Sequence, residues 1–204
     1  MDRTEFVFTI FFMLLGPLKV FPGFLNATRG ADRAFKRAVA FKAFAISSLI
    51  IAAVALLGQA LLHRYQISLD ALRLACGLVL LISALRAMFP TGEAPSDEAA
   101  APTATQVAIS PMAMPVIVTP AGIAAVLIFG MIAPANPGMQ MVVVWTLALI
   151  MASNLLAMLV ADWVVKIPGF MLVLLVLGSM IVFIQVALAI ETLVGALRSL
   201  GVVT

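Results

Sequence analysis

Apolar segments long enough to cross a lipid bilayer dominate this sequence and restrict its fold. A transmembrane helix needs about 20 consecutive apolar residues, and its backbone polar groups must be satisfied within the segment, which favours helices. The chain has 204 residues, 64% of them hydrophobic and 10% charged, and a mean hydropathy of +1.21. We therefore predict an all-α integral membrane protein, a bundle of six membrane-spanning helices. The six segments cover approximately residues 5–26, 38–62, 69–89, 106–132, 139–163 and 170–197.

Two of these segments are interrupted by prolines. The first contains GPLKVFPG at residues 16–23, and the fourth contains SPMAMPVIVTPAG at residues 110–122. A proline within a helix removes a backbone donor and clashes with the carbonyl one turn earlier, so we expect both segments to be broken helices. Within hydrocarbon, the broken backbone has to face protein or a water-lined cavity.

The spacing of the prolines indicates an internal repeat. Pro17 and Pro22 are five residues apart, as are Pro115 and Pro120, and the second pair follows the first by 98 positions. Two halves with three spans each must enter the membrane in opposite orientations, as in many secondary transporters. We therefore predict two inverted three-helix repeats with broken first and fourth helices. They cover residues 1–89 and 106–204, and a polar cytoplasmic linker covers residues 90–105.

The basic residues predict the orientation of the chain in the membrane. If the first connection, the linker and the fifth-to-sixth connection are cytoplasmic, seven Lys and Arg residues lie inside and four outside, which favours both termini outside. The inside set is Arg29, Arg33, Lys36, Arg37, Lys42, Arg86 and Lys166, and the outside set is Arg3, Arg64, Arg73 and Arg198.

The two breaks are where we expect a substrate to bind. Half-helix N-termini offer N–H groups and positive dipole ends to a carboxylate, and freed carbonyls can accept an ammonium group or an ion, so a zwitterionic amino acid suits such a site. Kinks that only shape helix packing are the alternative. The candidate binding residues at the breaks are Gly16, Pro17, Lys19, Pro22, Gly23, Ser110, Pro111, Pro115, Thr119, Pro120 and Gly122.

Three polar side chains lie inside the apolar segments. Lys19 either faces the bundle interior, where it could pair with a substrate carboxylate, or extends its long stem to the membrane interface. Asn154 and Gln185 lie in the middle of the fifth and sixth segments. Interhelical hydrogen bonds are the favoured role for both amides, and direct substrate contact is the alternative.

Several functional classes are disfavoured. The excess of basic residues is scattered over short connections, so nucleic acid is not an expected partner. Cys76 and His63 are the only residues of their types, which disfavours a disulfide, a metal site and histidine-based catalysis. No paired catalytic set stands out in the spans, and we expect a protein that is not an enzyme and has no cofactor. Coupling of transport to sodium or to protons is left open.

The broken first segment, which continues into FLNAT at residues 24–28, and above all AISPMAMPVIVTPAGI at residues 108–123 resemble the MarC family of bacterial inner-membrane proteins. The resemblance covers essentially the whole chain and implies transport of small neutral amino acids, as in the SnatA-like branch. The chain departs from the family pattern at Gly16 and Lys19, where the family usually has an acidic or amide residue and a glycine. Thr119-Pro120-Ala121-Gly122 replaces the usual Gly-Pro-Gly-Ala.

The expected function is therefore a carrier of small neutral amino acids of the alanine or glycine type, working by alternating access at the paired breaks. It would lie in the bacterial inner membrane with both termini periplasmic, in contact with lipid, and self-association into a homo-oligomer is left open. The alternatives are a passive channel for small solutes and a protein for antibiotic or metabolite efflux.

Overall fold

The computed structural model describes residues 3–89, 103–136, 138–167 and 169–202. Within these ranges the chain is helical and contains no strand, in agreement with the predicted all-α fold. Most of the predicted linker at residues 90–105 lies outside the described residues. The elements are α1 (Arg3–Leu15), α2 (Pro17–Ala27), α3 (Arg33–Arg64), α4 (Leu69–Met88), α5 (Ala104–Val107), η1 (Ala108–Ile117), α6 (Pro120–Ile132), η2 (Ala133–Ala135), α7 (Met139–Val164) and α8 (Phe170–Ser199).

Local sequence signals explain where several helices begin. Asp32 and Ser68 cap α3 and α4 by accepting hydrogen bonds from the backbone N–H groups of Phe35 and Ala71. The residues directly before α7 and α8 are Gly138 and Gly169, with φ of 80° and 82°. Glycine adopts this left-handed conformation without steric cost.

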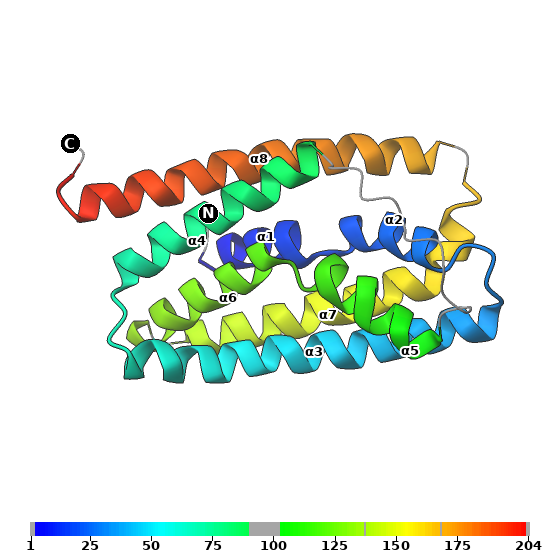
Figure 1. Cartoon of the computed structure of the whole chain (residues 1–204), viewed down its shortest axis with the longest axis horizontal. Coiled ribbons are helices and arrows are strands. Elements are labelled where there is room, and N and C mark those ends of the chain that lie inside the picture. Colours follow the sequence, from blue (N-terminus) through cyan, green and yellow to red (C-terminus); the bar gives the residue numbers. More distant parts are fainter. Residues whose placement is uncertain (1–2, 90–102, 137, 168, 203–204) are drawn as a thin grey trace.

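The helices form five unbroken or nearly unbroken spans and one bent span. Four are α3, α4, α7 and α8, and α1 with α2 makes the fifth, Thr4–Ala27. The sixth consists of Ala104–Ile117 and Pro120–Ala135, which meet at an angle of 60°. Successive spans cross the bundle in alternating directions, so that α1–α2 and α5–α6 run opposite to each other (Figure 1). This confirms the all-helical fold with a broken first and fourth helix, and the candidate spans number six when the bent pair is counted as one. The inverted repeat stays a prediction.

The first span occupies the middle of the bundle. In Figure 1, α4 and α8 lie on one side of α1–α2, and α3, α6 and α7 lie on the other. Phe11, Leu14 and Leu15 of α1 and Phe24 of α2 are buried in one apolar core with Met112, Ile117 and Ile150. This packing fixes α1–α2 against its neighbours, so the break between them lies at the centre of the molecule.

Two exposed tryptophans on α7 have the spacing expected for the two interfaces of a membrane. Trp145 and Trp163 are 69% and 71% exposed, and a rise of 1.5 Å per residue separates them by about 27 Å along the helix. The hydrocarbon core is about 30 Å thick, and tryptophan is enriched at both of its interfaces. Exposed Leu149, Leu156 and Leu159 lie between them, as expected for a helix face in contact with lipid.

Candidate functional site

The first break is a single extended residue between two helices. Gly16 has φ −78° and ψ 172° and precedes Pro17, the first residue of α2. A Cβ atom at position 16 would overlap the backbone oxygen of Phe12, so this turn requires glycine. Pro22 lies inside α2 without ending it, so the predicted break of this segment occurs at Gly16. Proline has no N–H, and the Leu18 carbonyl therefore loses its usual helical donor.

The second break is longer and involves three prolines. Extended backbone occurs at Ser110 and Met114, within η1, and both are followed by proline through a cis peptide bond. The helix resumes at Pro120, capped by Thr119, whose Oγ1 accepts a hydrogen bond from the Gly122 N–H at 2.9 Å. Pro120 therefore begins a helix, whereas Pro22, its predicted counterpart, lies inside one.

The two breaks are in direct contact. The Thr119 hydroxyl donates a hydrogen bond to the Leu14 carbonyl at the end of α1, at 3.1 Å. Gly122 packs against Leu15, and a Cβ atom there would overlap that side chain. Gly23 of α2 packs in the same way against Val116 of η1, with 2.8 Å between the position of an added Cβ and Cγ1 of Val116. The small residues at both breaks thus allow the broken helices to approach closely.

A cavity of about 1000 Å³ lies beside the contact between the breaks. Six of the predicted binding residues line it, namely Lys19, Pro22, Pro115, Thr119, Pro120 and Gln185. Leu18 and Ala121 also line it, and its remaining walls come from α4 and α8, from Gln185 to Met88 at the end of α4 and Met171 at the beginning of α8.

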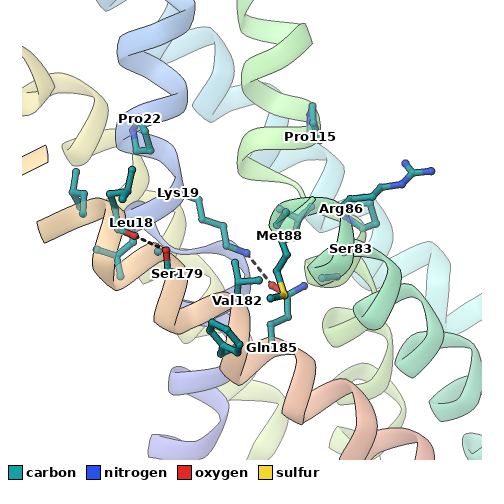
Figure 2. Close-up of a pocket in the computed structure, with 18 of the residues that line it drawn as sticks. Leu18, Lys19, Pro22, Ser83, Arg86, Met88, Pro115, Ser179, Val182 and Gln185 are labelled. Atoms are coloured by element: carbon teal, nitrogen blue, oxygen red, sulfur yellow. Dashed lines mark hydrogen bonds between the residues drawn. The ribbon is translucent and has the colours of Figure 1, made fainter. Parts of the chain in front are cut away.

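Lys19 points into this cavity. Its Nζ donates a hydrogen bond to Oε1 of Gln185 at 3.1 Å, and Figure 2 shows the side chain extending from α2 towards α8. Gln185 is buried, and its Nε2 donates to the Leu80 carbonyl of α4 at 3.3 Å. Lys19 therefore faces the bundle interior and does not extend its stem to the membrane interface. The ammonium group has three donors, and this hydrogen bond uses one of them.

The cavity is positively polarised. The first residues of α2 (Leu18 and Lys19) and of α6 (Pro120 and Ala121) line it, so the N-terminal ends of two helix dipoles face the same space as the ammonium group. None of the described residues that line the cavity is acidic. The arrangement can bind a carboxylate or another small anion.

The other predicted binding residues have structural contacts or lie away from the cavity. Asn154 is buried, and its Nδ2 donates to the Leu15 carbonyl at 2.7 Å, so it joins α7 to the end of α1. Its Oδ1 has no hydrogen-bond partner. Ser110 and Pro111 are exposed and do not line the cavity, and neither do Gly16, Pro17, Gly23 and Gly122.

Sequence reasoning missed three polar residues of the cavity wall. Ser83 and Arg86 come from α4 and Ser179 from α8. From the sequence, Arg86 served only to predict the orientation of the chain. Its side chain projects at the edge of the cavity, away from Gln185 (Figure 2). Ser83 and Arg86 are three residues apart and therefore share a helix face, which is the signal that could have identified them.

Comparisons with known proteins identify relatives over almost the full length. The profile of the MarC family of integral membrane proteins matches residues 4–200. The chain is also 28% identical over 203 residues to the UPF0056 membrane protein MJ1677 of Methanocaldococcus jannaschii, covering 97% of this chain and 98% of that protein. No solved structure matches the chain.

Proposed function

Because the chain belongs to the MarC family of integral membrane proteins, we propose that it is a carrier that moves small neutral amino acids across the membrane by alternating access. The observation that carries this proposal is the convergence of Lys19 and the N-termini of α2 and α6 on one cavity between the broken spans. The same layout in the SnatA-like branch suggests alanine or glycine as substrate.

The substrate carboxylate would bind at the positive end of the cavity. Two free donors of the Lys19 ammonium and the Ala121 N–H, which has no partner within α6, are available there. Gln185 holds Lys19 towards the cavity without neutralising it, because an amide carries no charge. A side-chain carboxylate in place of Gln185 would compete with the substrate for the same cation.

The substrate ammonium would bind to backbone and hydroxyl oxygens. The Leu18 carbonyl lacks its helical donor because residue 22 is proline, and Ser83, Thr119 and Ser179 add hydroxyl groups to the wall. The remaining lining is mostly apolar, including Val79, Val182 and Phe183. Such a wall accommodates a small apolar side chain better than a charged one.

Alternating access requires the cavity to open to one side at a time. The cavity extends to the end of α4 and the beginning of α8, which is the cytoplasmic side if positive residues face inward. On the opposite side, Thr119, Leu14 and Leu15 pack the breaks together. We propose that this is an inward-open state and that the opposite opening separates these contacts.

Counterflow of labelled alanine in proteoliposomes tests the proposal. In proteoliposomes loaded with unlabelled alanine, a carrier exchanges internal unlabelled alanine for external labelled alanine. Uptake of the label is then saturable, and its internal concentration transiently exceeds the equilibrium value. A passive channel gives neither exchange acceleration nor saturation, and that result would favour the alternative function. Repeating the assay with and without a sodium gradient, and with and without a pH gradient, tests ion coupling.

Replacing Lys19 tests the site within the same assay. A charge-assisted hydrogen bond contributes about 1.5–3 kcal/mol, and about 1.4 kcal/mol corresponds to tenfold in binding. We therefore expect Lys19→Ala to lower the uptake rate at limiting alanine by about tenfold or more. Lys42→Ala is the matched control, because Lys42 is exposed on α3 and donates a hydrogen bond to Thr105, outside the cavity. Unchanged uptake by Lys19→Ala, with protein that melts normally, would contradict the role of this residue.

A further inference from the structure

A second pocket lies between the beginning of α3 and the end of α7, outside the cavity described above. It has a volume of about 250 Å³. Both helix ends lie on the side of the bundle where α2 ends and α8 begins (Figure 1). Its lining residues include Arg33, Lys36, Arg37, Asp162 and Lys166.

The charges in this pocket are unbalanced. Lys36 forms an ion pair with Asp162, with 2.6 Å between Nζ and Oδ1. Among the described residues that line the pocket, Asp162 is the only acidic one. Within the described part of the chain, Arg33, Arg37 and Lys166 have no carboxylate within 4.0 Å. Three cations therefore remain available to an anion from outside the protein.

The pocket also lies at the level of the lipid head groups. Trp163 lines it and is 71% exposed, and tryptophan side chains favour this interface. Leu159 lines the pocket as well, and Leu156, one turn earlier on α7, is exposed on the same side. A cationic pocket thus continues directly into an apolar face that extends into the hydrocarbon.

The general preference for basic residues on the cytoplasmic side of a membrane protein explains why these residues lie at this end of the bundle. It does not explain why basic residues from two separate spans converge on one concave site beside an exposed tryptophan. We propose that this pocket binds the phosphate head group of an anionic phospholipid, with an acyl chain along Leu159 and Leu156. Arginine binds phosphate oxygens through paired N–H groups, and lysine adds a point charge. Basic pockets between membrane helices recognise such head groups.

Native mass spectrometry of the full-length protein in detergent tests this site. The probes are dioleoyl-phosphatidylglycerol, dioleoyl-phosphatidylcholine with the same acyl chains, and inorganic phosphate. The test variant is Arg37→Gln with Lys166→Gln, which leaves the Lys36–Asp162 ion pair intact. The matched control is Arg64→Gln with Arg198→Gln, which removes two exposed cations at the other ends of α3 and α8.

We expect phosphatidylglycerol to bind the unmodified protein and the control variant equally, and the test variant at least fivefold more weakly. The exchange Arg37→Lys with Lys166→Arg, which keeps both charges, should retain most of the binding. Equal weakening in the test and control variants, or equal binding of the two lipids to the unmodified protein, would overturn the proposal. Inorganic phosphate that binds as tightly as phosphatidylglycerol and depends on the same two residues would overturn the assignment to a lipid.

Discussion

Gln185 shows how one buried amide can set the electrostatics of the cavity. It accepts a hydrogen bond from Lys19 and donates one to the Leu80 carbonyl, so a single side chain on α8 links α2 and α4. A neutral partner orients the ammonium group and leaves its charge available to a ligand. The residue therefore supports the bundle and positions Lys19 at the same time.

Changing this amide to a carboxylate removes the donor to the Leu80 carbonyl and turns the contact with Lys19 into an ion pair. Gln185→Glu keeps the size of the side chain and forms an ion pair with Lys19, which neutralises the cavity. We expect the apparent KM for alanine to rise by about tenfold, because the substrate carboxylate must displace a charged partner worth about 1.5–3 kcal/mol. Uptake kinetics in proteoliposomes measure this.

The matched control for that exchange is Gln59→Glu, since Gln59 of α3 packs against Gly130 of α6, away from the cavity. A KM that is the same for Gln185→Glu and for the unmodified protein would contradict the proposed function of Lys19 as the carboxylate partner.

The polar residues inside the spans could be located from the sequence, but their partners could not. Asn154, Lys19 and Gln185 are conspicuous because apolar residues surround them. Their partners are distant in the chain, 139 residues away for Asn154 and 166 for Lys19, and no local pattern encodes such contacts. Interhelical hydrogen bonding, the favoured role for both amides, is confirmed by the bonds to Leu15 and Leu80.

At the scale of the elements, the prolines predicted that two helices are broken but not where each break falls. Pro22 remains within α2, while Pro120 begins α6, so equal spacing does not produce equal backbone conformations. At the first break the decisive residue is Gly16, whose missing Cβ leaves room for the Phe12 carbonyl. A proline removes a hydrogen bond wherever it occurs, but the packing around it determines whether the helix ends there.

The requirement for glycine at the first break can be tested directly. Gly16→Ala places a Cβ atom against the backbone oxygen of Phe12, so α1 must shift, and overpacking of this kind costs about 1–3 kcal/mol. We expect a clear fall in melting temperature in detergent. Gly195→Ala, in α8, is the control, because no atom lies within 4 Å of an added Cβ there. Equal melting temperatures for the two variants would show that the break tolerates a side chain.

For the whole molecule, the arrangement of the spans and the distribution of charge agree on one orientation. The connections from α2 to α3 and from α7 to α8 lie at the same end of the bundle (Figure 1), and that end holds Arg33, Lys36, Arg37 and Lys166. The opposite end holds Arg64 and Arg198. Positively charged connections favour the cytoplasm, so we propose that both termini are periplasmic and that the 1000 Å³ cavity opens inward.

Single cysteines placed at the two ends of α3 test this orientation in cells. The native Cys76 is 4% exposed, so it should give little background with a membrane-impermeant maleimide. Ala34 and Tyr65 are both exposed, at the beginning of α3 and directly after its end. We expect Tyr65→Cys to react in intact spheroplasts and Ala34→Cys to react only in inverted membrane vesicles. The reverse pattern would place the termini in the cytoplasm and make the cavity open outward. The side of one connection determines the side of all the others, because successive spans run in alternating directions.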